Sequence, residues 1–111
     1  MIWRIRERRA FSRIAAEGQR ARAGVLWCTY VLDPPGNSTP PRVAFALGRA
    51  LGPAVDRNRV RRQLRAMLQA ASSAGRLPAG VYLFGARPTA ASRSSVELEF
   101  DLTAILARLN R

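Results

Sequence analysis

The stretch Arg57-Asn58-Arg59-Val60-Arg61-Arg62-Gln63-Leu64-Arg65 decides both the fold and the chemistry of this chain. Apolar residues continue beyond it at helical spacing and form one stripe, made of Val60, Leu64, Met67, Leu68 and Ala71. The arginines occupy the rest of the helix circumference, where guanidinium groups repel one another unless an anionic partner is near. The stretch therefore predicts a helix from about Pro53 to about Ala71 that packs on a core and presents a cationic face.

Positive charge dominates the whole chain of 111 residues, which has 19 basic residues, 7 acidic residues and a net charge of +12. Every basic residue is an arginine, a bias that we attribute to a genome rich in G and C. The excess of charge itself indicates a polyanionic partner, because so basic a protein is self-repulsive without one. Nucleic acid is the first candidate and an anionic membrane surface is the second.

Length and composition predict one domain that covers residues 1–111, since 48% of the residues are hydrophobic, enough for a single small core. The longest apolar runs, 25–32 and 81–86, are too short to span a bilayer. Arginines interrupt the N-terminus where a signal peptide needs its apolar segment. The sequence therefore predicts a cytoplasmic protein with no membrane partner.

Two more helices are predicted, one near each end of the chain. The first is a basic amphipathic helix within residues 1–20, which begins near Arg6 and ends at Gly18. The residues able to share its apolar face are Ile5, Phe11, Ile14 and Ala15. The last helix is predicted to begin at Ser94, because Ser94 and Glu97 have the spacing of a capping box.

Strands are predicted at residues 25–32, 42–48 and 81–86, with a polar, proline-rich connection at 33–41. The second strand alternates between large residues (Val43, Phe45, Leu47) and small residues (Ala44, Ala46, Gly48). We expect the large face in the core. The small face leaves room for a closely packed helix, which the residues alone favour, or for a ligand lying on the sheet.

The side chains that catalysis needs are scarce. The chain has no histidine, no Gly-rich phosphate loop and one cysteine, Cys28, which excludes an intrachain disulfide. Glu97, Glu99 and Asp101 are close in sequence, but their spacing does not bring all three to one helix face. They are better explained by the helix dipole than by a metal site. Arginines, aromatic residues and a sheet are instead typical of a protein that binds RNA or DNA.

The segment from Arg42 to Arg49, followed by Gly52 to Arg65, resembles the protein subunit of bacterial ribonuclease P. The family signature is Gly-x-Ala-Val-x-Arg-Asn-Arg-x-(Lys/Arg)-Arg-x-(Leu/Ile)-Arg, and residues 52–65 match it closely. Further positions fit the family along most of the chain, namely Phe11, Gly18, Tyr30 and the segment 81–88. A signature of this length is specific, whereas Arg-Asn-Arg alone would not be.

The resemblance implies an α/β two-layer sandwich like domain 2 of ribosomal protein S5, with a left-handed β-α-β crossover through the arginine helix, an exception to the usual handedness. It also implies the function of an accessory subunit. Ribonuclease P removes the 5′ leader of precursor tRNA, and its catalytic centre belongs to an RNA subunit that uses Mg²⁺. The metal would be bound mainly by that RNA and the substrate. The implied partners are the catalytic RNA subunit and precursor tRNA, with no obligate protein partner.

Site residues follow from the resemblance position by position. The residues that would bind the RNA subunit are Arg57, Asn58, Arg59, Arg61, Arg62, Arg65 and Arg49. The residues that would line a cleft for the leader are Phe11, Cys28, Tyr30 and Ala46, with Arg57 and Asn58 at its edge. Phe11 and Tyr30 would stack on or flank unpaired bases, and no residue of the protein would be catalytic.

Three positions depart from the family pattern. Ala15 stands where many members have a second aromatic residue, which weakens stacking on the leader. Ala50 stands where many have a second basic residue, and Pro53 replaces a common asparagine.

Other functions on the same residues remain open at this point. The main alternative is a ribosomal or ribosome-assembly protein of the same fold. A DNA-binding regulator would lay the arginine helix in the major groove, but no second recognition element is evident. A standalone nuclease is disfavoured, since the chain lacks histidine and has few acids.

Overall fold

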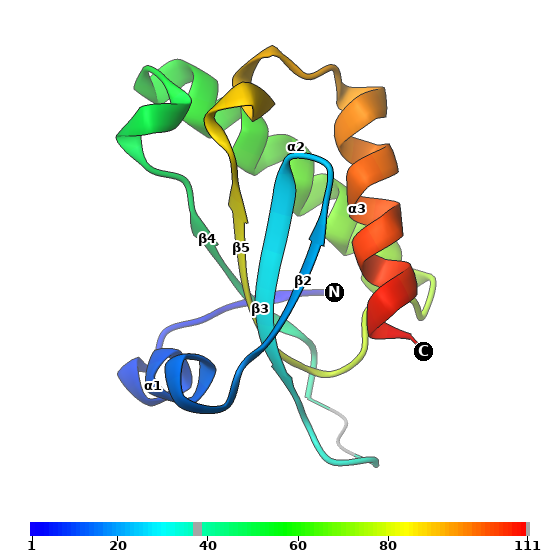
Figure 1. Ribbon diagram of the computed structural model, residues 1–111. Coiled ribbons are helices and arrows are strands. Elements are labelled where there is room, and N and C mark those ends of the chain that lie inside the picture. The colour runs from blue at the N-terminus through cyan, green and yellow to red at the C-terminus, as the bar shows by residue number, and fades with distance from the viewer. Residues whose placement is uncertain (37–38, 111) are drawn as a thin grey trace.

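The chain folds around a five-stranded mixed sheet with the strand order β1-β4-β5-β3-β2 (Figure 1). The computed structural model describes residues 1–36 and 39–110, so residues 37 and 38 of the predicted connection, and residue 111, lie outside the description. The strands are β1 (Trp3–Arg4), β2 (Gln19–Ala23), β3 (Leu26–Leu32), β4 (Arg42–Ala46) and β5 (Gly80–Ala86). Strand β4 is parallel to both β1 and β5, whereas β3 is antiparallel to β5 and β2.

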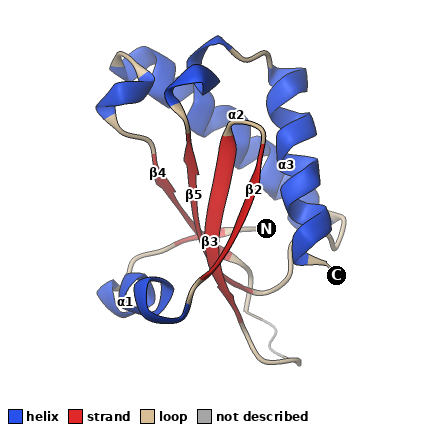
Figure 2. Ribbon diagram, viewed as in Figure 1, coloured by secondary structure: helices blue, strands red, loops and turns tan. Residues whose placement is uncertain are grey.

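The helices are α1 (Arg8–Glu17), α2 (Ala54–Ser73) and α3 (Ser95–Leu109), with short 3₁₀ helices η1 (Arg49–Leu51) and η2 (Pro88–Ser92). Figure 2 shows α2 and α3 together on one side of the sheet and α1 apart from them. The predicted mixed α/β class is confirmed, while α1 adds a partial third layer to the two layers expected. Among the described residues, no helix is both long and apolar enough to cross a membrane.

The arginine helix forms as predicted, with Pro53 as its N-cap residue. Its apolar stripe is buried completely at Val60, Leu64, Leu68 and Ala71. These side chains join one core cluster with α3 and with the aromatic residues of the sheet. Full burial of a leucine side chain stabilises a fold by about 1.5–3 kcal/mol, so α2 is held by its stripe while its arginines stay outside the core.

The large face of β4 lies in the core, as expected. Val43 is 1% exposed, and Phe45 packs against the same cluster. The neighbouring positions on β5 are Tyr82 and Phe84, both fully buried, because Val43 pairs with Tyr82 and Phe45 with Phe84. This face of the sheet is therefore aromatic and is covered by α2 and α3.

The other face of the sheet is covered only in part, by α1. Ala10 and Ile14 of α1 pack with Ile5 and Val81 in a second, smaller cluster. The predicted stop at Gly18 is confirmed, and its reason is a close approach rather than a positive φ. A Cβ at Gly18 would overlap with the carbonyl of Ile14 and the side chain of Thr29 on β3.

The last helix is tied to the β2–β3 hairpin by a buried acid. Asp101 accepts a hydrogen bond from Arg93 Nη2 at 2.9 Å and another from the backbone N–H of Val25 at 3.2 Å. The capping box of Ser94 and Glu97 forms as predicted. Asp101 thus holds the hairpin in place, in addition to the interaction with the helix dipole that the sequence predicts.

Two strands, β1 and β2, were not predicted. Strand β2 has the sequence Gln-Arg-Ala-Arg-Ala, which is too polar and too short of β-branched residues to be recognised as a strand. Strand β1 has only two residues. Both lie at sheet edges, where charged residues are common because they discourage pairing with another chain.

Candidate nucleic-acid interface

A groove runs between α1 and the uncovered part of the sheet. It consists of two adjoining hollows of about 310 and 530 Å³, which meet at Phe11 because that side chain lines both. We call them together the α1 groove. The first hollow is lined by Arg4, Ile5, Phe11, Val43, Ala44, Phe45, Arg61 and Arg65, and the second by Phe11, Ile14, Ala15, Gly18, Arg20, Trp27, Thr29 and Leu83. Neither set of lining residues contains a carboxylate, so the groove is cationic.

Trp27 forms an aromatic platform on the sheet at one end of this groove. Its ring occupies the space above Gly85, its cross-strand neighbour, where a Cβ would overlap with the indole. The guanidinium carbon of Arg20 lies 4.9 Å from the centre of the ring. With Gly85 on one side and a guanidinium group over its ring, the indole forms an apolar and cationic surface suited to contact with a nucleic-acid strand.

The other end of the groove borders the arginine helix. Arg61 and Arg65 of α2 line it, and the guanidinium carbon of Arg65 lies 5.5 Å from the centre of the Phe45 ring. Arg61 also donates a hydrogen bond to Asn58 Oδ1 at 2.8 Å. The α1 groove and the cationic face of α2 therefore meet along one edge.

The arginines of α2 are not equivalent. Arg62 and Arg65 are exposed, as is Arg49 of η1, whereas Arg57 is half-buried with its Nε shielded and unpartnered among the described residues. Arg59 is held within the protein. It donates to the carbonyl of Ala91 at 2.6 Å and to Gln63 Oε1 at 3.2 Å, and so ties η2 to α2. Arg59 thus has a structural role, and its contact with RNA stays a prediction.

The predicted cleft residues do not share one face. Phe11 is 41% exposed and lines the groove, and Ala46 is exposed on the same side of the sheet. Cys28 and Tyr30 alternate with Trp27 and Thr29 along β3, and therefore point to the opposite face. Cys28 is fully buried, and burial raises the pKa of its thiol far above the ordinary value.

Tyr30 is held in the aromatic core in the same way. It is 8% exposed, its ring stacks on Tyr82 at 6.1 Å between centres, and its hydroxyl donates to Gln19 Oε1 at 3.2 Å. The placement of Cys28 and Tyr30 in the cleft is therefore wrong, because the choice of face was reversed for β3.

The groove residues that sequence reasoning missed are Trp27, Thr29, Leu83, Arg20 and Arg4. The sequence did contain a signal for Trp27. It stands three residues before Tyr30 in the same strand, and therefore lies on the opposite face of the sheet. The second signal was Gly85, since glycine inside a strand often marks a close approach by another group. Arg20 had no signal, because β2 was not recognised.

Among the described residues, no three histidine, cysteine or carboxylate side chains come close enough together to bind a metal ion. Asp33 and Asp101 are each paired with an arginine. These residues do not fit a Mg²⁺ ion held by the protein alone.

The chain is similar in fold and in sequence to known proteins. Two solved structures share the fold: the ribonuclease P protein of Staphylococcus aureus (TM-score 0.82, 20% identity, 96% of this chain and 94% of that chain) and that of Thermotoga maritima (TM-score 0.76, 22% identity, 95% and 96%). Among curated relatives, the ribonuclease P protein component of Thermobifida fusca is 36% identical and aligns with 97% of this chain and 76% of its own. That of Nocardioides sp. is 36% identical over 96% of this chain and 90% of its own.

These relatives support the ribonuclease P prediction and give no support to a ribosomal or ribosome-assembly protein. The family model described as Ribonuclease P matches residues 2–110, nearly the whole chain. The chain therefore belongs to the ribonuclease P protein family, whose members are accessory subunits of a ribonucleoprotein endoribonuclease.

Proposed function

We propose that this protein binds the catalytic RNA subunit through the exposed arginines of α2 and the 5′ leader of precursor tRNA through the α1 groove. The observation that carries the proposal is the shared edge of the two surfaces, where Arg61 and Arg65 line the same hollow as Phe11. A leader in the groove would lie beside the RNA subunit bound to α2. The chain supplies binding and orientation, and the chemical step belongs to the RNA.

The groove suits a single strand of varied sequence. Phe11 offers an aromatic surface on which any base can stack, and such a stack contributes about 1–3 kcal/mol. Trp27, with Arg20 over its ring, offers an apolar and cationic surface in the same hollow. Ala44 and Ala46 allow the strand to approach the sheet closely. Arg20 would contact phosphates, which fixes the strand in place without reading its bases.

Magnesium enters this proposal as an ion of the RNA and the substrate. When bound there, it would supply the activated water and stabilise the leaving group. The arginines of α2 reduce repulsion between neighbouring phosphates, so the assembled enzyme would need less Mg²⁺ than the RNA alone.

The finer description of the fold stays a prediction. The likeness to domain 2 of ribosomal protein S5 and the left-handed β4-α2-β5 crossover both rest on the family resemblance. The same holds for the cytoplasmic location and for the expectation of no obligate protein partner.

Reconstitution tests the proposal. The chain, mixed with the RNA subunit at low Mg²⁺, should restore cleavage of precursor tRNA. Phe11→Ala should raise KM for a substrate with a leader and leave the affinity for mature tRNA unchanged, because only the leader occupies the groove. Failure of the wild-type chain to restore cleavage would contradict the function, and an unchanged KM would contradict the groove.

A further inference from the structure

A larger hollow, outside the α1 groove, lies beside the edge strand β1. Its volume is about 690 Å³, within the range of small-molecule sites. We call it the Trp3 pocket, and its lining residues are Ile2, Trp3, Arg4, Ile5, Arg6, Glu7, Ala10, Thr39 and Arg42. It shares Arg4 and Ile5 with the α1 groove, so a strand leaving the groove could continue into it.

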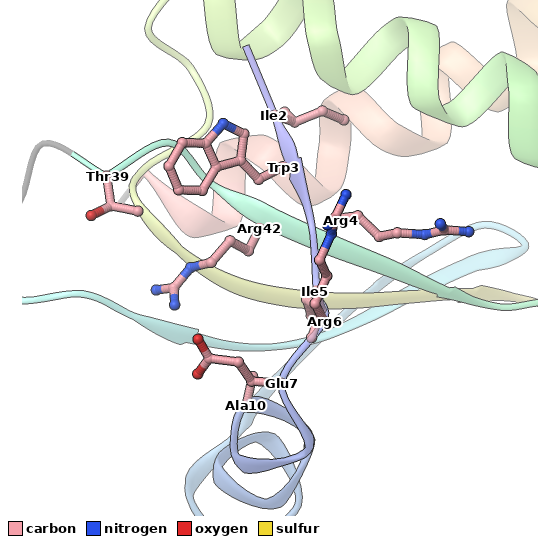
Figure 3. A pocket seen from close by; sticks show the side chains of 9 residues that line it. All are labelled: Ile2, Trp3, Arg4, Ile5, Arg6, Glu7, Ala10, Thr39 and Arg42. Atoms are coloured by element: carbon pink, nitrogen blue, oxygen red, sulfur yellow. The ribbon is translucent and has the colours of Figure 1, made fainter.

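The pocket has an apolar floor and one aromatic wall. Ile5 and Ala10, which belong to the smaller core cluster, are each 6% exposed, whereas Trp3 is 49% exposed. Figure 3 shows the Trp3 ring on the same side of β1 as Arg42, while the side chain of Arg4 extends to the other side. A half-exposed indole above an apolar floor is suited to a flat partner that stacks on it.

The polar groups of the pocket combine donors with an acceptor. Arg42 Nη2 donates to both carboxylate oxygens of Asp33, at 3.1 and 3.2 Å, and its Nε is buried without a partner among the described residues. The Glu7 carboxylate is the one acid among the lining residues, and Figure 3 shows it directed toward the Arg42 guanidinium group. An aromatic ring, a donor and an acceptor that line one pocket are the groups that recognise a nucleobase.

We propose that the Trp3 pocket binds one unpaired nucleobase of RNA, stacked on Trp3, and prefers bases with an exocyclic amino group. Such a group donates to a carboxylate, as cytosine N4 does to glutamate, and uracil has none. Glu7 is then the residue that determines this preference for bases with an amino group. The proposal rests on the proposed function only in expecting RNA as the ligand, and the base has two sources, the leader or the RNA subunit.

Fluorescence tests the pocket without any enzymatic activity. Trp27→Phe leaves Trp3 as the one tryptophan of the chain, which has two. Oligo(C) should quench it with an affinity at least about fivefold higher than oligo(U) of the same length. Glu7→Ala should remove the difference, and it preserves the start of α1 because Glu7 makes no side-chain capping bond. No quenching by oligo(C), or equal quenching by both, would overturn the proposal.

Reconstituted enzyme identifies the source of the base. If Trp3→Ala lowers the affinity only for substrates with long leaders, the bound base comes from the leader. If Trp3→Ala weakens binding of the RNA subunit, the base comes from that RNA. Trp3→Phe should restore either one, because phenylalanine keeps a ring. An affinity unchanged for both RNAs would overturn the proposal. Phe11→Ala, measured with a short leader, tests the α1 groove alone. A failure of the proposed function can therefore be told apart from a failure of the Trp3 pocket proposal.

Discussion

The indole of Trp27 rests on the backbone of Gly85, the residue opposite it across β3 and β5. Glycine is required there because any Cβ at position 85 would overlap with the ring. Trp27 lines the α1 groove at the end away from the arginine helix. An aromatic platform on the sheet therefore depends on the absence of a side chain on the neighbouring strand.

Gly85→Ala should displace Trp27 and lower the free energy of unfolding by about 1–3 kcal/mol, as overpacking does. It should also weaken leader binding. Urea unfolding followed by tryptophan fluorescence measures the first effect. Gly48→Ala is the matched control, since a Cβ there meets nothing within 4 Å and φ is −83°. Equal stability of the two variants would show that Trp27 does not rest on Gly85.

Arg62→Ala should weaken binding of the RNA subunit and reduce the slope of log affinity against log salt by about 0.7–0.9, the value for one lost phosphate contact. Arg59→Ala should leave the slope nearly unchanged and lower stability instead, because Arg59 donates to the carbonyl of Ala91. Binding titrations at several salt concentrations measure the slope.

Arg108 provides the control for that comparison, since it is an exposed arginine in the last turn of α3 rather than on α2. Its change to alanine should alter neither slope nor stability. A slope change for Arg59→Ala as large as that for Arg62→Ala would return Arg59 to the interface.

Asp101→Ala should destabilise the fold by about 1–3 kcal/mol, because it leaves the N–H of Val25 without its acceptor and leaves Arg93 with Glu97 alone. Glu99→Ala, an exposed change two positions away on the same helix, should stay within about 0.5 kcal/mol of wild type. Chemical denaturation measures the free energy of unfolding of both variants. Similar values would mean that the hairpin does not depend on Asp101.

Cys28 should resist thiol reagents in the folded protein and react once the protein is unfolded. Burial raises the pKa of its thiol, so the reactive thiolate is scarce as well as shielded. The double variant Cys28→Ala, Ala46→Cys moves the thiol to the exposed face and should react quickly. Rapid labelling of native Cys28 would place it in the groove after all.

The capping box should make stability depend on acid. Hydrogen bonds from the backbone and side chain of Ser94, with the nearby charge of Arg93, hold the pKa of Glu97 below its ordinary value of 4.5. A lowered pKa in the folded state stabilises the fold above the unfolded-state value, and this contribution is lost as pH falls through the folded-state value.

Glu97→Gln should therefore lose less stability than wild type between neutral and acidic pH, because glutamine keeps the capping bond and does not titrate. Unfolding midpoints at pH 7 and at acidic pH measure the difference. An identical pH dependence in both proteins would remove Glu97 as a source of acid sensitivity.

The sequence predicts a helix correctly where its side-chain pattern fits only one local structure. The stripe from Val60 to Ala71 at helical spacing, and the Ser94 capping box, each match a single local structure. The face of β3 was a different kind of problem. Both of its faces carry large residues, with Cys28 and Tyr30 on one and Trp27 and Val31 on the other, so alternation alone could not say which face meets α1.

That choice depends on register with distant strands. Only the pairing of Trp27 with Gly85 and of Tyr30 with Tyr82 shows which face is open. Strand β2 escaped prediction because its partner, β3, supplies the stability that its own arginines and alanines lack. The candidate site was thus predictable in kind, a cationic surface with aromatic residues, and only partly in its members.

The position of β5 has a consequence for synthesis of the chain. β5 is the central strand, yet its residues, Gly80–Ala86, are made after all four other strands. Until they leave the ribosome, β1 can pair only with β4 and β2 only with β3, as two separate pieces. The floor of the groove and the surface on which α2 packs would then form in one late event. A nascent chain would carry its arginines for some time before it could place them on an RNA.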